Sequence, residues 1–235
     1  MARAHLDRQP QEVAQMFDAV AGGYDRMNAV MTFGRERRWR EVVADALAPA
    51  PGDRVLDLAA GTGASSLPIR ARGACPVAVD FSQGMLRVGR REHPGLDLVA
   101  GDALRLPFAD AAFGGATISF GLRNVADVGL ALAEMARVTR PGGRLVVLET
   151  SAPLRQPMRA GHHFYVEQVL PRLARLAASD QEAYRYLAES VGDWPTPQGL
   201  AELMRGAGWA AVTWRQLMLG AVAIHVAIRP TSTPG

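Results

Sequence analysis

Hydrophobic and polar positions follow two patterns that alternate along much of the chain. Between residues 54 and 151, short continuous apolar runs alternate with segments whose apolar residues recur at helical spacing. Continuous runs are typical of strands buried on both faces of a parallel sheet, and helical spacing is typical of the amphipathic helices that cover it. The pattern predicts an α/β fold with a mostly parallel sheet.

Seven strands are expected. Five buried runs lie at 54–60, 75–81, 96–103, 112–121 and 144–151, with a turn at 140–143 before the last of them. The final two runs, 210–218 and 219–229, are joined by so short a turn that they must be antiparallel. Helices are expected at 13–31 (broken at Gly22 and Gly23), 35–47, 82–92 (capped by Ser82), 125–139 and 155–190, and after the turn that begins at Gly61.

Composition narrows the class of protein. The 235 residues are 49% hydrophobic and 21% charged, which is ordinary for a globular protein, and the formal net charge is only +3. All 26 basic residues are Arg, and they are scattered, so no nucleic-acid-binding surface is expected. The single cysteine, Cys75, excludes an internal disulfide, and no signal peptide or membrane span is recognisable, so a cytoplasmic protein is expected.

A glycine-containing turn follows the first strand. Gly61 and Gly63 would let the backbone approach a ligand closely, and the next helix would offer N–H groups to a carboxylate or phosphate. A dinucleotide fingerprint would have a third glycine at position 66, where this chain has Ser66. The turn therefore favours a nucleoside ligand other than a nicotinamide or flavin dinucleotide.

Acidic residues belong to three successive strands. Asp57 lies inside the first strand, Asp80 ends the second, and Asp102 follows the third. Parallel strands place their carboxyl ends at one edge of the sheet, where open α/β sheets bind ligands. Asp80 suits the two hydroxyls of a ribose, and Asp102 suits the exocyclic amine of an adenine. The alternative is that each aspartate only caps a helix or forms a turn.

These motifs resemble those of class I S-adenosylmethionine-dependent methyltransferases. "VLDLAAGTG" is similar to their first motif, "VAVDFSQGML" to the second, "GDALRLPF" to the third, and "RPGGRLVVLE" to the segment around the fifth strand. The resemblance implies a Rossmann-like, seven-stranded, mostly parallel sheet with an antiparallel last strand, helices on both faces, a helical lid, and S-adenosylmethionine as cofactor. It implies cofactor contacts from Asp57, Gly61, Thr62, Gly63, Asp80, Phe81, Met85, Asp102, Ala103 and Ser119.

A narrower resemblance is to the ubiquinone/menaquinone biosynthesis C-methyltransferase family. It rests on "MFDAVAGGYDRMNAVMTFGRERRWR", "TISFGLRNVADV" and "AYRYLAESVGDWP", and runs from about residue 12 to 229. It implies methylation of a ring carbon of a demethylmenaquinol-type quinol, with Arg123 and Asn124 facing the acceptor. Arg123 is a poor base because it is always protonated, but it could stabilise a phenolate or polarise a water that Asn124 orients. Tyr24 is a third candidate catalytic residue, and Asp25 could accept a proton.

The resemblance also divides the chain into four regions. These are an N-terminal helical lid (1–50), a cofactor-binding core (51–154), a helical insertion over the acceptor site (155–192), and the C-terminal part of the core sheet (193–229). The acceptor would be a small, apolar, aromatic molecule. Peripheral contact with a membrane and a homodimer are further hypotheses, and no metal site is expected.

Some residues depart from the family pattern. Thr150 replaces an aromatic residue, "RQLMLGAVAIH" replaces "RNLTGGIVAIH", and His162 and His163 have no counterpart. Either histidine could be an acceptor base or a surface residue, whereas His225 is expected to be structural. The departures leave open a specialised-metabolite (polyketide or similar) C- or O-methyltransferase, or a cofactor-binding cyclase. A non-catalytic binding protein and a nicotinamide-dependent oxidoreductase are the alternatives from other classes.

Overall fold

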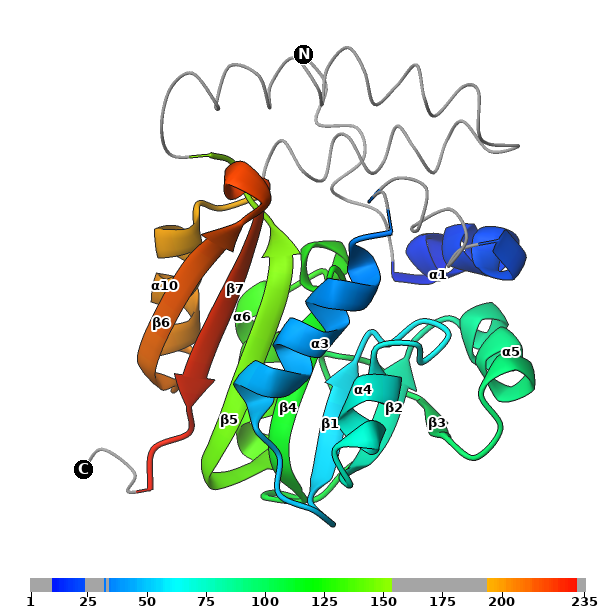
Figure 1. The fold of residues 1–235 in the computed structure, drawn as a ribbon, viewed down its shortest axis with the longest axis horizontal. Helices are drawn as coiled ribbons and strands as arrows, with labels where there is room; N and C mark the ends of the chain where they lie inside the picture. The colour runs from blue at the N-terminus through cyan, green and yellow to red at the C-terminus, as the bar shows by residue number, and fades with distance from the viewer. Residues whose placement is uncertain (1–9, 24–31, 33, 154–193, 232–235) are drawn as a thin grey trace.

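A mixed sheet with helices on both faces forms the protein (Figure 1). The computed structural model describes residues 10–23, 32, 34–153 and 194–231. The strands lie in the order β3-β2-β1-β4-β5-β7-β6, and β7 is antiparallel to both neighbours while the other pairs are parallel. The predicted topology is therefore confirmed. The strands are β1 Arg54–Leu58, β2 Cys75–Asp80, β3 Asp97–Ala100, β4 Phe113–Ser119, β5 Thr139–Thr150, β6 Ala210–Leu217 and β7 Val222–Ile228.

The described helices agree with the periodicity of the sequence. They are α1 Pro10–Val20, α3 Glu36–Leu47, α4 Ser66–Ala71, α5 Gln83–Glu92, α6 Val128–Val138 and α10 Pro197–Gly206, with short 3-10 turns η1 Ala21–Gly23, η2 Leu122–Asn124 and η4 Met218–Gly220. The predicted cap is confirmed, since the Ser82 hydroxyl accepts a hydrogen bond from Met85 N at 3.1 Å. No described helix is long and apolar enough to cross a bilayer.

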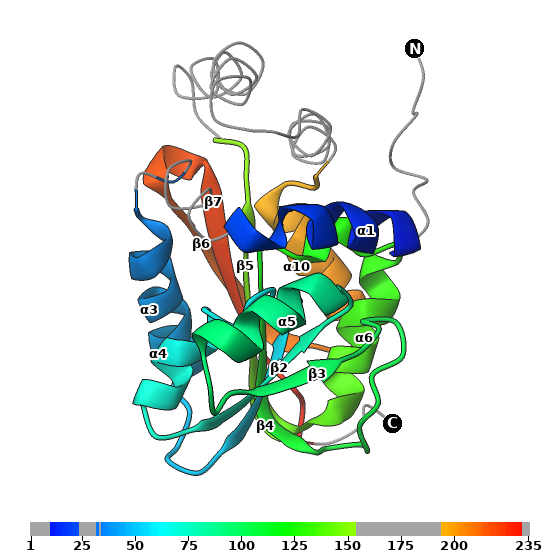
Figure 2. The same cartoon turned by 90° about the vertical axis from the view of Figure 1, so that its right-hand side faces the viewer.

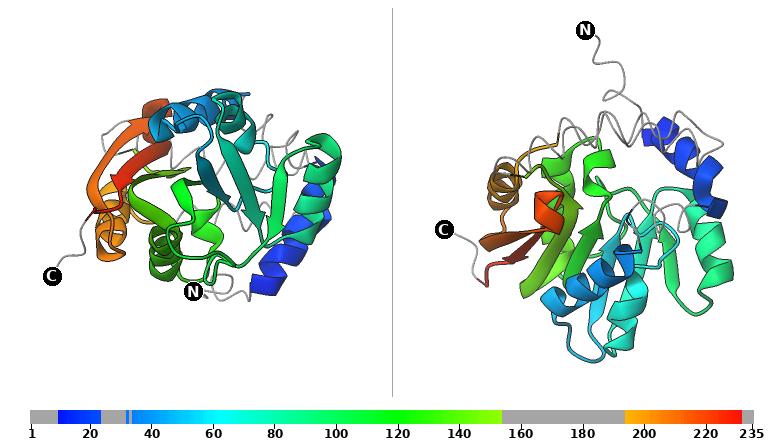
Figure 3. Two further views of the ribbon diagram at one scale, coloured as in Figure 1. Left: turned by 90° about the horizontal axis from the view of Figure 1, so that it is seen from below. Right: turned by 45° about the horizontal axis from the view of Figure 1, so that its top comes forward.

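Two clusters of buried apolar side chains lie between the sheet and the helices on its two faces. One joins α6 and α10 to one face through Met135 and Trp209, and the other joins α3 and α4 to the opposite face through Val43 and Ile69. Figure 2 looks at these layers from the β3 side, where α5 packs against β2 and β3, and α1 lies beside α5. The carboxyl ends of β1, β2, β4 and β5 share one edge of the sheet, which comes forward in Figure 3 (right).

The predicted turn at 140–143 is wrong as a boundary, because β5 already begins at Thr139. The register jumps from Phe113↔Thr139 to Gly115↔Arg144, so these residues form an irregularity within the strand. Gly143 permits it, since a Cβ there would lie 2.7 Å from the carbonyl oxygen of Gly114. Close backbone contact, which the "RPGG" signature does not reveal, lets pairing continue through the turn sequence.

Several expectations fall outside the described residues. They concern Tyr24, Asp25, His162, His163 and the 155–192 region. His225 is described, and its Nε2 lies 2.8 Å from the carbonyl oxygen of Pro197 at 1% exposure, which confirms a structural position.

Candidate active site

The buried carboxylate of Asp57 stabilises the glycine-containing turn that follows β1. Its carboxylate is fully buried, and Oδ2 accepts hydrogen bonds from the hydroxyls of Ser65 and Ser66, both at 2.7 Å. Burial raises the pKa of Asp57 to about 6, and the two hydroxyl hydrogen bonds oppose that rise. The residue thus connects β1 to the first residues of α4, where it fixes the path of the turn between them.

The turn itself requires glycine. Gly61 and Gly63 have φ values of +59° and +85°, in the left-handed region. A Cβ on Gly63 would lie 3.0 Å from Leu96 Cδ1, so a side chain there would be crowded as well as strained by the positive φ. Thr62, between them, is 2% exposed. The sequence correctly predicted a tight turn that brings the backbone to the carboxyl end of β1.

Asp80 joins this turn to the next one. Its Oδ2 accepts a hydrogen bond from Gly61 N at 2.8 Å, and its Oδ1 accepts one from Ser82 N at 2.8 Å. Burial raises the pKa of Asp80, and these backbone hydrogen bonds oppose the effect. Each carboxylate oxygen has a second lone pair. The neighbouring Phe81 is 41% exposed, whereas Met85 is only 1% exposed, so the structure opens Phe81 rather than Met85 to a ligand.

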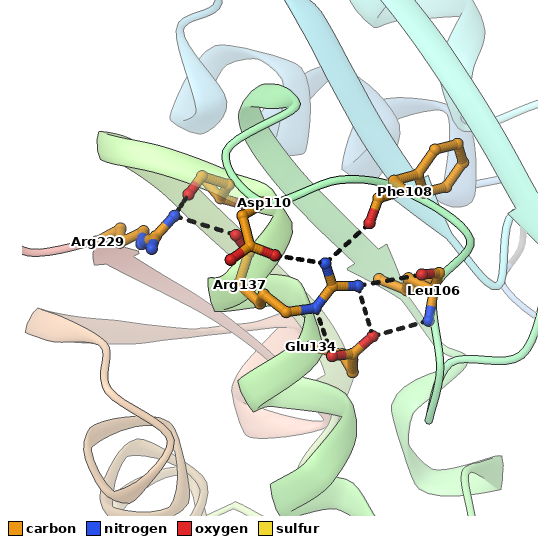
Figure 4. Close-up of polar contacts among 7 residues, drawn as sticks. Leu106, Phe108, Asp110, Glu134, Arg137 and Arg229 are labelled. Carbon is orange, nitrogen blue, oxygen red and sulfur yellow. Dashed lines mark hydrogen bonds and ion pairs between the residues drawn. The ribbon is translucent and has the colours of Figure 1, made fainter.

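The loop after β3 carries Asp102 and Ala103 and is held by a network that the sequence did not predict. Asp102 Oδ1 accepts a hydrogen bond from Leu104 N at 2.9 Å, which shapes the loop. Arg137 on α6 donates to the carbonyl oxygens of Leu106 at 3.1 Å and Phe108 at 2.8 Å (Figure 4). The same guanidinium binds Asp110 and Glu134, and Glu134 in turn accepts from Leu106 N (Figure 4). A planar, five-donor group suits this clamp.

Arg123 has a buried partner, Glu149, that the sequence analysis did not identify. Its Nη1 lies 2.7 Å from Glu149 Oε1, and the two side chains are 8% and 1% exposed. The backbone N of Arg123 also donates to Glu149 Oε2, at 3.3 Å, because η2 turns the chain back towards β5. The guanidinium therefore pairs with a buried carboxylate that the sequence did not reveal, and the expected contact of Arg123 with the acceptor stays a prediction. Glu149 was missed, although it is a charged residue near the end of the apolar run "RLVVLE".

Four polar atoms near this ion pair have no hydrogen-bond partner. They are Ser119 Oγ, Arg123 Nε, Asn124 Oδ1 and Thr150 Oγ1, all buried. Ser119 and Thr150 end the adjacent strands β4 and β5, and η2 follows β4 directly. Buried polar atoms in proteins are nearly always hydrogen-bonded. Unpaired polar atoms at the ligand-binding edge of an α/β sheet are available to hydrogen-bond a ligand or water there.

Comparison with known proteins shows which family the chain belongs to. The model of the ubiE/COQ5 methyltransferase family matches residues 5–229. The chain belongs to this family. It is 54% identical over 230 residues to a demethylmenaquinone methyltransferase of Mycobacterium sp. (strain KMS), covering 98% of this chain and 99% of that one. A protein of the same name from Streptomyces avermitilis is 53% identical over 225 residues, covering 96% and 97%.

Two solved structures have a fold similar to that of this chain. The [4+2]-cyclase SpnF has a TM-score of 0.68 at 19% identity, covering 95% of this chain and 97% of its own. A possible histamine N-methyltransferase from Thermotoga maritima has a TM-score of 0.67 at 19% identity, covering 92% and 99%. At such identities the likeness shows the fold alone. Membership of the family makes the protein a methyltransferase that uses S-adenosylmethionine.

Proposed function

We propose that the protein methylates a ring carbon of a demethylmenaquinol-type quinol. The observation that carries the proposal is the 54% identity to a demethylmenaquinone methyltransferase over nearly the whole of both chains. The specialised-metabolite and cyclase alternatives are not favoured, because the relatives of that name match from end to end. The unpaired polar atoms at the ends of β4 and β5 support an acceptor with its own oxygen atoms.

The cofactor would be held along the edge formed by β1, β2 and β3. Asp80 accepts from the backbone N–H groups of Gly61, Ser82 and Phe81, and the acceptor capacity left on its carboxylate suits the ribose hydroxyls. The exposed ring of Phe81 fits the face of a base. Gly61, Thr62 and Gly63 bring backbone to the same place, and Asp102, Ala103 and Ser119 continue the edge. S-adenosylmethionine supplies an activated methyl group. The protein's main task is alignment of the two reactants, which contributes roughly 7–11 kcal/mol in well-oriented systems.

Arg123 would act on the acceptor as a hydrogen-bond donor. A quinol carbon becomes nucleophilic when the neighbouring hydroxyl loses its proton, and a fixed donor aimed at that oxygen lowers the free energy of the resulting phenolate. Glu149 fixes the guanidinium, while Nε remains unpaired and able to donate. Asn124 Oδ1, also unpaired, can accept a hydrogen bond from a hydroxyl or from the water that removes the proton. The role of Tyr24 stays a prediction.

The tip between β6 and β7 supports the peripheral membrane contact. Leu219 is 79% exposed and Met218 is 40% exposed. Both lie at the end of the sheet where β5 finishes with Thr150, whose hydroxyl oxygen is one of the unpaired atoms. Both residues have positive φ, +47° for Met218 and +55° for Leu219, which is unusual for large side chains. An exposed apolar tip beside the acceptor site suits a bilayer that carries a polyprenyl quinol. The homodimer stays a prediction that analytical ultracentrifugation would test.

Transfer of a labelled methyl group tests the proposal. The purified protein is incubated with methyl-labelled S-adenosylmethionine and a reduced demethylmenaquinone analogue, and the product is analysed by fragmentation mass spectrometry. Label on a ring carbon is expected, with loss of turnover in Asp80→Ala. Label on an oxygen, or none at all from folded protein that binds the cofactor, would overturn the assignment. The oxidised quinone serves as the control, because it has no hydroxyl whose deprotonation would make the ring carbon nucleophilic, and so no ring hydrogen should be replaced by the methyl group.

A further inference from the structure

Helix α1 contacts the start of α5 through the carboxylate of Asp18. Asp18 Oδ1 accepts a hydrogen bond from Gly84 N at 2.7 Å and another from the hydroxyl of Ser82. Both donors belong to the first turn of α5, beside which α1 lies (Figure 2). Asp18 therefore supplies, from 64 and 66 residues away, an acceptor for N–H and O–H groups at the start of that helix.

Gly84 is shaped for this contact. A Cβ at Gly84 would lie 2.8 Å from Asp18 Cα and 2.8 Å from Asp18 Oδ1, closer than any real Cβ contact. The backbone of α1 can only approach α5 so closely because position 84 has no side chain. Helical glycine is otherwise unfavourable, so its presence within α5 needs a reason of this kind.

The contact continues to the proposed ribose carboxylate. Ser82, whose hydroxyl donates to Asp18, also donates its backbone N–H to Asp80 Oδ1 at 2.8 Å. The Ser82 hydroxyl accepts from Met85 N at 3.1 Å, which fixes its orientation. The charge of Asp18 adds to the burial that raises the pKa of Asp80. Asp18, Ser82 and Asp80 thus form one chain of hydrogen bonds.

We propose that Asp18 is a positioning residue that docks α1 on α5 and thereby holds Ser82 and Asp80 in the arrangement that binds the cofactor. Docking of α1 and binding of the cofactor are then coupled, and the coupling is reciprocal. If docking of α1 raises the affinity for the cofactor by a given factor, bound cofactor raises the docking equilibrium of α1 by the same factor. The inference rests on the proposed cofactor contact of Asp80 and needs nothing from the acceptor.

Three variants and a control test the coupling. Asp18→Ala removes the acceptor, and Asp18→Asn keeps an Oδ1 acceptor without the charge. Gly84→Ala keeps Asp18 and closes the space it needs. Glu12→Ala changes an exposed acid on the same helix and is the matched control. The readouts are the Kd of S-adenosylhomocysteine by calorimetry and hydrogen exchange of the α1 amides with and without that ligand.

Asp18→Ala and Gly84→Ala are expected to weaken binding about 5- to 20-fold, to speed exchange in α1, and to abolish its ligand-dependent protection. Asp18→Asn should stay within about threefold of the wild type, and Glu12→Ala should match it. Unchanged affinity in Asp18→Ala would overturn the proposal, and so would faster exchange in α1 without a change in affinity. Asp80→Ala separates the two ideas: if it leaves affinity unchanged, the cofactor assignment of Asp80 fails instead.

Discussion

The ion pair between Arg123 and Glu149 leads to an unequal pair of mutational effects. The side chains are 8% and 1% exposed, with Nη1 and Oε1 2.7 Å apart. Removal of one partner from a buried pair costs about 3–5 kcal/mol, because the other charge stays buried without compensation. After Arg123→Leu, Glu149 keeps hydrogen bonds from two backbone N–H groups. After Glu149→Leu, the one partner that the guanidinium keeps among the described residues is the carbonyl oxygen of Phe120. Glu149→Leu is therefore expected to be the more destabilising change.

Urea unfolding of both single variants and of the double variant measures these costs. The double variant should lose less than the sum of the singles by about 1–3 kcal/mol, since neither charge is left alone. A surface pair would give single effects of about 0–1 kcal/mol and little coupling. If the singles lose less than about 1 kcal/mol, or if Arg123→Leu is the more damaging change, the geometry of the pair has been misread.

Three further predictions follow from groups around the same edge. Burial raises the pKa of Asp57 from 3.8 to about 6, so the folded protein binds this proton more tightly than the unfolded chain, and Asp57 lowers stability as pH rises through that interval. The free energy of unfolding of Asp57→Asn minus that of the wild type should rise by on the order of 3 kcal/mol as the pH increases through that interval, and it should be constant above pH 7. A difference that does not change with pH would contradict this prediction. Arg137→Lys should weaken cofactor binding severalfold, measured by calorimetry, because an ammonium cannot hold the loop around Asp102 at several points, and an unchanged Kd would refute this. Leu219→Asn should lose sedimentation with anionic or neutral vesicles without loss of thermal stability, because asparagine tolerates positive φ; retained sedimentation would exclude the tip as the contact.

Short-range features of the fold were predictable from the sequence. Parallel strands are buried on both faces, so β1, β2 and β4 appear as short, mostly apolar runs rather than as alternating patterns, with Asp57 as a buried exception in β1. The link between Gly61 and Asp80 was also within reach, because strand ends of neighbouring parallel strands meet at one edge. The cap on α5 follows from Ser82 immediately before an amphipathic segment.

Long-range polar partners were not predictable in the same way. The partner of Arg123 is 26 residues away, and their meeting depends on the register of β4 with β5 and on the turn of η2. Asp18 meets Gly84 across 66 residues. No local pattern encodes such pairs, because a polar residue in an amphipathic helix is equally consistent with exposure to solvent. Patterns identified the residues that carry charge, and only the structure shows which of them neutralise each other.

Neutralisation of Arg123 has a consequence for the proposed reaction. S-adenosylmethionine carries a positive sulfonium, and an isolated guanidinium at the same edge would repel it. With Glu149 at 2.7 Å, the pair has no net charge, so the edge can hold a cationic cofactor and still offer Nε to an acceptor oxygen. If the sulfonium binds about 15 Å from the Glu149 carboxylate, the two charges interact by roughly 1 kcal/mol at an effective dielectric constant of about 20.

Glu149→Gln exposes this effect, because it removes the negative charge and keeps an oxygen acceptor. Binding of cationic S-adenosylmethionine should weaken about fivefold more than binding of neutral S-adenosylhomocysteine, the value that corresponds to roughly 1 kcal/mol. The comparison of two ligands in one variant cancels any general loss of stability. An equal change for both ligands would mean that Glu149 only holds Arg123 in place. The double variant Arg123→Leu/Glu149→Leu, which is neutral at both positions, is the matching control, and it should keep the wild-type ratio of the two dissociation constants.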